Sequence, residues 1–405
     1  PYLSEAMIVV TDEAQSGITL TKRAITAFVE SNWDKMHLAN VNTTLKTVIN
    51  NNNKLLFGYE YSNNNVLYNL QRSYSDAPSF NYQINKDAKN NTHALFGEYI
   101  YKTDKKTAIH FGLRANHFSL TKKTFFAPRV YAQTKLNALI LLKTSLEYKQ
   151  QNISQLVEFD TSDFGLENQV WVLAENEKVP VLKSDQITLG FVFNKDNWTV
   201  DLDFYKKNIT GLTSFTNGFV SLNSSNLIGK GSTNGIDFLI KKKWKNYNTW
   251  ISYSLSNSKN TFEVLNNNQS FAANFDTKHN FLWSHNLKIG NYNFSLGWSK
   301  RTGIPYTPAI GLNSSDEIVY GTINSKRLPN YEKVDFSSTY SFSFDKEEKI
   351  KGKLGVSLLN IANKKNILKR SYETSLNNNT NLYELKEVNN ISLGFTPNLV
   401  FRVDF

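Results

Sequence analysis

The segment ISLGFTPNLVFRVDF, residues 391–405, ends the chain and carries the pattern that decides the fold. Counting back in steps of two from the last residue gives one apolar series: Phe405, Val403, Phe401, Leu399, Pro397, Phe395, Leu393 and Ile391. The positions between them are mostly polar. Because successive side chains of a β-strand point to opposite faces, the segment is predicted to be a strand with one apolar face. It is long enough to cross a bilayer at a tilt.

The composition excludes a helical membrane protein. Only 40% of the 405 residues are hydrophobic, and no stretch of the sequence approaches the length of apolar residues that a transmembrane helix requires. A membrane β-barrel is still permitted, because only every second residue of its strands faces lipid. The 27 Phe, 20 Tyr and 7 Trp residues would supply the aromatic girdles at the two membrane interfaces.

The chain has no cysteine and a formal net charge of +11. The absence of cysteine fits an exported protein without disulfides and equally a cytosolic one. The lysines and arginines are scattered, and no nucleic-acid motif accompanies them, so we expect no nucleic-acid partner. Residue 1 is not followed by a signal peptide, which predicts that the signal was removed or that the true N-terminus is missing.

Alternation of apolar and polar residues recurs along nearly the whole chain and predicts about sixteen strands. The predicted ranges are 17–31, 36–49, 54–71, 92–103, 106–117, 124–135, 140–150, 184–194, 197–208, 232–243, 246–257, 277–288, 292–301, 331–344, 352–362 and 391–405. From residue 72 onward the connections mostly alternate between long and short. The long ones are 72–91, 151–183, 209–231, 258–276, 302–330 and 363–390.

Short turns at one rim and long loops at the other are typical of an outer-membrane barrel. A soluble β-sandwich is the rival fold, but its strands are usually shorter and its loops show no such asymmetry. We therefore predict an all-β, transmembrane antiparallel barrel. A chain that ends on an aromatic residue in such a strand looks like a bacterial outer-membrane barrel, whose last strand carries the assembly signal. Phe395, Phe401 and Phe405 are the candidates for that signal.

An ordered series of short motifs resembles the C-terminal barrel of a TonB-dependent receptor of the Bacteroidota type. The resemblance covers residues from about 120 to 405 well and the first hundred poorly. Its clearest motifs are FAPR at 126–129, VLKSDQ at 181–186, GSTNGIDF at 231–238, FDTKHN at 275–280, TGIPYT at 302–307, LPNY at 328–331 and LNIAN at 359–363.

The resemblance implies a barrel of about 22 strands with a plugged lumen. Residues 1–405 are then expected to be a C-terminal part of that barrel, with the plug domain and the first strands outside this sequence. The implied partners are outer-membrane lipid, the barrel-assembly machinery and TonB, which acts through the plug. A surface lipoprotein is a further candidate partner. A natural barrel of about sixteen strands, as in open porins, is the alternative.

The sequence contains no phosphate-binding loop, metal-spaced cluster or nucleophile elbow, so we expect no enzyme, cofactor or metal site. In Asp276-x-x-His279 the carboxylate is expected to accept backbone amides or to pair with the imidazole. Pro305 and Pro308 indicate loop conformation. Asn360 and Asn363 are expected to tie a strand end through bonds from side chain to backbone.

The predicted function is uptake of a scarce solute across the bacterial outer membrane, with energy from the inner-membrane proton gradient through TonB. An aromatic ring exposed on a loop can stack on a ligand. The candidate ligand contacts are Phe164, Trp171, Phe215, Phe219 and Tyr306, although the same rings could instead pack loop against loop. A scaffold subunit of a larger complex and a passive porin are the alternative functions, and the sequence does not specify the solute.

Overall fold

The computed structural model describes residues 6–13, 18–30, 34–50, 52–72, 82–103, 106–157, 171–176, 178–217, 220–314, 316, 318–344, 350–377 and 379–404. Phe164, Phe219 and Phe405 lie outside these residues. Within them, no helix is long and apolar enough to cross a membrane.

Most of the chain forms one antiparallel sheet of 18 strands. Apart from β15, a two-residue ladder on β14, each strand pairs with the next wall strand in chain order. The strands are β1 (Ala6–Glu13), β2 (Ile18–Glu30), β3 (Asp34–Val48), β4 (Asn53–Arg72), β5 (Tyr82–Thr103), β6 (Thr107–Phe118), β7 (Lys123–Lys135), β8 (Ile140–Gln151), β11 (Leu182–Lys195), β12 (Trp198–Asn217), β13 (Val220–Lys243), β14 (Tyr247–Phe262), β15 (Phe271–Ala272), β16 (His279–Ile289), β17 (Tyr292–Arg301), β22 (Tyr331–Ser343), β23 (Lys351–Leu359) and β26 (Thr396–Asp404).

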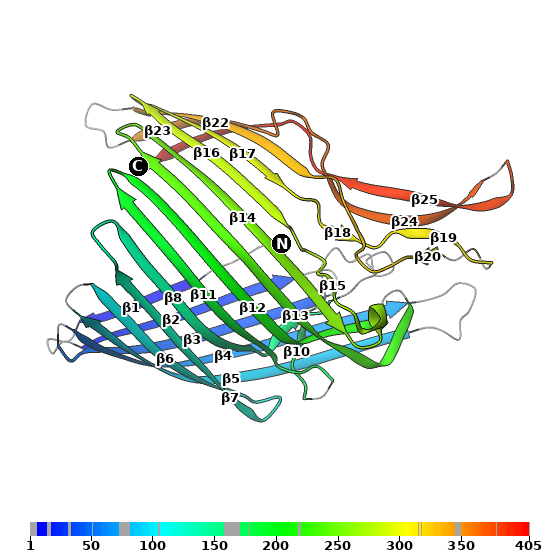
Figure 1. Ribbon diagram of the computed structural model, residues 1–405, viewed down its shortest axis with the longest axis horizontal. Coiled ribbons are helices and arrows are strands. Elements are labelled where there is room, and N and C mark those ends of the chain that lie inside the picture. Colours follow the sequence, from blue (N-terminus) through cyan, green and yellow to red (C-terminus); the bar gives the residue numbers. More distant parts are fainter. Residues whose placement is uncertain are drawn as a thin grey trace.

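The all-β antiparallel prediction is confirmed, and every predicted strand range overlaps a strand of this sheet. The sheet curves round so that the first strands lie opposite β14 to β17 (Figure 1). Among the described residues, β1 pairs only with β2, and β26 pairs only with β23. The curved wall therefore has two free edges.

The two faces of the wall differ in polarity as the alternation predicts. In the last ladder Phe401 lies opposite Leu354, and Leu399 lies opposite Val356. All four side chains are exposed on the outer, convex face. The same face carries exposed large apolar side chains on the other strands, including Phe57, Leu95, Phe111, Leu113, Leu146, Ile187, Leu189, Phe191, Phe204, Leu255, Trp283 and Leu296. The wall thus presents an apolar band outward, and its polar positions face the concave side.

The long connections contain small ladders of their own. These are β9 (Ile153–Gln155) with β10 (Trp171–Leu173), β18 (Pro305–Tyr306) with β21 (Lys326–Arg327), β19 (Ala309–Leu312) with β20 (Ile318–Tyr320), and β24 (Ile367–Asn377) with β25 (Leu382–Ile391). A 3₁₀ turn, η2 (Leu265–Asn268), lies in the connection before β16. All of these elements lie towards one end of the wall (Figure 1).

Several boundary predictions were wrong. The predicted loop 72–91 contains the start of β5 at Tyr82, and the predicted loops 258–276 and 363–390 contain the end of β14 and the β24–β25 hairpin. No strand was predicted for β1.

The interval 209–231 was predicted as a long loop, but β12 continues to Asn217 and β13 begins at Val220. The apolar alternation of 198–204 stops at the polar run Lys206, Lys207 and Asn208, while the backbone ladder continues, as in the pair Thr213↔Ile228. This places Phe215 on a strand rather than in a loop.

The last wall strand also begins later than predicted, at Thr396. Two asparagines take up the backbone groups just before it, because Asn360 Nδ2 donates to the Leu393 carbonyl at 3.1 Å and the Phe395 amide donates to Asn363 Oδ1 at 2.9 Å. Phe395 therefore lies at the rim. The predicted role of Asn360 and Asn363 in tying a strand end is confirmed.

Candidate functional site

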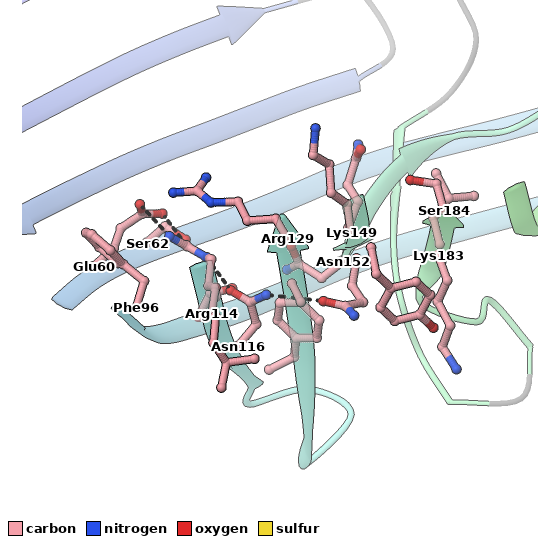
Figure 2. Close-up of a pocket in the computed structure, with 18 of the residues that line it drawn as sticks. Glu60, Ser62, Phe96, Arg114, Asn116, Arg129, Lys149, Asn152, Lys183 and Ser184 are labelled. Atoms are coloured by element: carbon pink, nitrogen blue, oxygen red, sulfur yellow. Dashed lines mark hydrogen bonds and ion pairs between the residues drawn. The ribbon is translucent and has the colours of Figure 1, made fainter. Parts of the chain in front are cut away.

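The concave face holds a cavity of about 570 Å³ below the long connections (Figure 2). Side chains from eight wall strands, β3 to β8, β11 and β12, line it. Only the inner side of a curved sheet can bring strands so far apart in the sheet to one cavity. We take this polar concavity as the candidate functional site.

Charged side chains on this wall are fixed by ion pairs. Arg114 donates to Glu60 through both terminal nitrogens, at 2.9 and 3.2 Å, and its Nε donates to Asn116 Oδ1 at 2.7 Å. Glu98 lies 3.0 Å from His110 Nδ1 and 3.1 Å from Arg129. These pairs hold the guanidinium groups in fixed orientations. A guanidinium group binds a carboxylate or a phosphate in a defined geometry through paired hydrogen bonds.

The connection that carries β9 and β10 folds over the concave face. β10 lies against β4 and β5. Phe118, Ala174 and Val181 form a small buried core with Phe125 packed against it. Trp171, a predicted ligand contact, begins β10 and is half-buried in this inward fold. The connection therefore narrows the space above the cavity.

A second charge cluster lies on the concave face away from the cavity. Lys143 Nζ lies 2.8 Å from Asp201 and 2.9 Å from Asp203. The side chains of Asp203 and Lys143 lie over Gly190, where an added Cβ would collide with Asp203 Oδ1. Glycine is required here so that the lysine can reach both carboxylates.

An ion pair between a buried carboxylate and a partly exposed arginine ties two long connections together. Asp276 is 2% exposed, accepts the Ser258 amide at 2.7 Å and pairs with the guanidinium of Arg327. Arg327 also donates to the Asp276 and Gly303 carbonyls, at 2.8 and 3.1 Å. The prediction that the Asp276 carboxylate accepts a backbone amide is confirmed. The alternative partner, His279, lies with Tyr253, whose hydroxyl is 2.7 Å from His279 Nδ1.

Tyr306, another predicted ligand contact, is part of a polar and aromatic cluster at the base of the β24–β25 hairpin. Arg370 donates to its hydroxyl at 2.9 Å and lies over its ring, 5.0 Å from the ring centre. Arg370 also pairs with Glu387 at 2.9 Å. Tyr320 and Tyr372 meet edge to face at 6.3 Å nearby. The sequence did not single out Arg370 or Tyr372, because their partners lie on separate connections.

A family model matches a short part of the chain. Residues 1–51 match the model described as "FimL C-terminal domain". A curated relative, "Scaffold protein FimL" from Pseudomonas aeruginosa (strain PAO1), is 59% identical over 46 residues, which are 11% of this chain and 8% of that protein. This match is too short to show a family for the whole chain.

Solved structures resemble almost the whole chain in fold. The FrpB iron transporter from Neisseria meningitidis (F5-1 variant) has a TM-score of 0.64 and 11% identity, over 99% of this chain and 63% of that one. The outer membrane transporter YddB from Escherichia coli has a TM-score of 0.63 and 11% identity, over 98% of this chain and 61% of that one. The ferric yersiniabactin uptake receptor FyuA from Yersinia pestis has a TM-score of 0.58 and 13% identity, over 96% of this chain and 58% of that one. The chain thus spans roughly three fifths of the length of these structures and shares their barrel fold.

Proposed function

We propose that this chain forms most of the wall of a TonB-dependent receptor that imports a scarce solute across the bacterial outer membrane. One observation carries the proposal. The curved wall presents apolar side chains outward and gathers fixed charges around a cavity on its concave face. An outer apolar band and a polar lumen are what a membrane barrel requires. The structural likeness to outer-membrane transporters supports the same function.

We further propose that residues 1–405 are a C-terminal part of a larger barrel. The free edges of β1 and β26 support this, because an open edge presents unpaired backbone groups that lipid cannot satisfy. Strands from outside this sequence would close the wall, and a plug would fill the lumen and connect it to TonB. The order of motifs from 126 to 363 supports the Bacteroidota type.

In this function the ligand would meet the long connections first. Phe164, Trp171, Phe215, Phe219 and Tyr306 stay the candidate contacts, and the apolar outer face around Phe401 is the surface that the barrel-assembly machinery would receive. The solute is bound without a cofactor or metal of the protein's own, and no catalysis is involved. A surface lipoprotein could cover the same rim.

Planar-bilayer recording of the full-length gene product, purified from outer-membrane fractions, tests the transporter. A plugged receptor is expected in the outer-membrane fraction and should be nearly silent in the bilayer. A steady large conductance would identify a passive porin instead. A folded monomer that stays in solution without detergent would contradict the membrane location.

A scaffold subunit of an outer-membrane complex is the second candidate. The match of residues 1–51 to a domain of a protein named as a scaffold favours it. Binding of the full-length gene product to the purified periplasmic part of TonB separates the two functions. The transporter should bind TonB, and a pure scaffold should not.

A further inference from the structure

A groove of about 760 Å³ crosses the strands β11 to β14, which run side by side in the wall (Figure 1). Most of its lining residues belong to three rows of directly paired residues. The lowest row is Leu189, Phe204, Ile236 and Leu255. The next row towards the long connections is Ile187, Lys206, Asn234 and Asn257, and the row after it is Asp185, Asn208, Ser232 and Lys259. We name this feature the outer groove.

All three rows point to the convex face. Paired residues of an antiparallel ladder project to the same side, and so do residues two apart on one strand. Leu189, Phe204 and Leu255 are exposed on the convex face, so Lys206 and Lys259 project there too. The remaining lining residues are Tyr205, Gly235 and Ser256, which lie between the rows along the strands, and Lys278, just before β16. The apolar floor and the paired lysines of the outer groove therefore share one face.

The outer groove lies where the outward apolar residues end. On β12 the outward positions are Trp198, Val200, Leu202 and Phe204, followed by Lys206. The distance from Trp198 to Phe204 along a strand is about 20 Å. This is close to the height of the apolar band of outer-membrane barrels, about 25 Å. The polar end of the groove is therefore at the level of lipid headgroups, on the side of the long connections.

The polar end carries positive charge that no described residue neutralises. Lys206, Lys259 and Lys278 line the groove, and no carboxylate does. All three lysines are exposed, and none forms an ion pair within the part of the chain that the structure describes. The carboxylate of the upper row, Asp185, instead accepts from Asn208 Nδ2 at 2.7 Å. The lysines are thus available to an anion from outside the protein.

The two outward lysines are placed to hold one anion between them. Lys206 and Lys259 lie on strands separated by β13, which sets them about 10 Å apart across the sheet. Each carries its charge on a flexible four-carbon stem, so the two ammonium groups can approach a common ligand. Asn234 and Asn257 are paired directly between them and offer amide donors. The apolar row of Phe204 and Leu255 begins immediately below.

We propose that the outer groove binds a lipid with a phosphate headgroup. The phosphate lies between Lys206 and Lys259, and an acyl chain runs along Phe204 and Leu255 towards the middle of the bilayer. Lysine forms charge-assisted bonds to phosphate, and the apolar floor matches the chain of the same molecule. An acidic protein is less well matched, because it would have to replace lipid over the apolar floor. The inference rests on the proposed membrane location.

Native mass spectrometry of the full-length gene product in detergent tests the proposal. Dioctanoyl phosphatidic acid should be retained about tenfold better than dioctanoylglycerol, which has the same chains without the phosphate, because one charged hydrogen bond is worth about that factor. The double variant Lys206→Gln/Lys259→Gln should lose this preference. The matched control Lys241→Gln/Lys353→Gln removes two exposed cations on the concave side and should keep it.

The apolar half of the site needs its own measurement. Phe204→Ser should weaken retention of the phosphatidic acid several-fold, because the acyl chain loses its main contact. Inorganic phosphate at the same concentration should not displace the lipid. Full displacement by inorganic phosphate, with no effect of Phe204→Ser, would show a site for a free anion and overturn the lipid site. Displacement by polyglutamate would identify a contact for an acidic protein instead.

Two further results would overturn the lipid site. They are equal retention of the two lipids and an unchanged preference in the Lys206→Gln/Lys259→Gln variant. Recovery of the protein in the outer-membrane fraction is scored separately. Recovery there without a lipid preference refutes only this inference, and absence from that fraction refutes the membrane location as well.

Discussion

The wall and the connections at its long-loop end are stabilised in different ways. The wall repeats one arrangement, a ladder with an apolar outer side and a polar inner side, over strand after strand. The connections depend on a few buried or partly buried polar side chains, above all Asp276, Arg327 and Asn360, which bond to backbone groups of neighbouring segments. A repeated arrangement tolerates single changes, whereas such a polar centre does not. The following substitutions test this contrast, starting with the largest expected effect.

Removal of the buried carboxylate with Asp276→Ala should release the connections at 263–278 and 302–330. Arg327, which is partly exposed, would lose its counter-ion, and the Ser258 amide would lose its acceptor. At about 1.5–3 kcal/mol for each hydrogen bond to a charged group, the two losses together should cost about 3–5 kcal/mol. Hydrogen exchange of the two connections measures the effect, and the wall strands should keep their protection. Asp276→Asn retains the acceptor for Ser258 and should lose less. Equal protection in all three proteins would show that the ion pair does not hold this end.

A charge on the convex face should destabilise the wall in lipid. Leu399 is 72% exposed there, so Leu399→Lys should cost about 2–4 kcal/mol if the residue lies near the bilayer midplane. Its neighbour Val400 points to the concave side and is also exposed, so Val400→Lys is the matched control and should be almost neutral. Urea unfolding in lipid vesicles gives both values. Similar losses for the two variants would contradict the assignment of the faces.

A methyl group on the concave face should test how tightly the Lys143 cluster is packed. In Gly190→Ala the new Cβ would collide with Asp203 and Lys143, and overpacking of this kind costs about 1–3 kcal/mol. Gly297 lies on β17 with nothing within 4 Å of an added Cβ, so Gly297→Ala is the control and should be neutral or slightly stabilising. Thermal unfolding in detergent compares them. Equal midpoints would mean that the cluster repacks freely.

The same contrast explains what the sequence could predict. The strands of the wall could be predicted because period-two alternation is a local pattern, and the same pattern recurs in each strand. The extension of β12 beyond residue 208 was missed because the apolar alternation stops there while the backbone ladder continues. The assembly of Tyr306 with Arg370, and of Asp276 with Arg327, could not be read in this way, because these partners are separated by 64 and 51 residues.

The end of the β7–β8 ladder at Arg129↔Glu147 shows a second limit of sequence reasoning. FAPR at 126–129 was noticed as a motif, but whether the nitrogen of Pro128 faces β6 or β8 follows only from the strand register. The inward fold of β9 and β10 over the wall likewise depends on which side of the sheet is concave. Among the candidate contacts, the structure places Trp171 and Tyr306 in ordered ladders, and their role in binding stays a prediction.

Alkaline pH should loosen the β24–β25 hairpin, which is the smallest effect of the series. Burial is the main cause that raises the pKa of Tyr372 above its ordinary value of 10.0. The negative charges of ionised Tyr306 and of Glu387 raise this pKa further. The folded hairpin then holds the phenolic proton more tightly than the unfolded chain does. The stabilisation that protonated Tyr372 gives the hairpin is complete below the pKa of tyrosine in the unfolded chain. It declines as the pH rises through the higher pKa that Tyr372 has in the folded hairpin. The chain has no cysteine, so a nitroxide at Ser375→Cys can report hairpin mobility without interference.

Tyr372→Phe removes the titrating hydroxyl and should flatten the alkaline rise in nitroxide mobility. Tyr383→Phe is the matched control, because Tyr383 is 48% exposed near the tip of the same hairpin and should leave the rise in place. A rise that survives in Tyr372→Phe would assign the alkaline change to another group. It would also show that the cluster around Tyr306 is less decisive for this hairpin than the centre around Asp276 is for its neighbours.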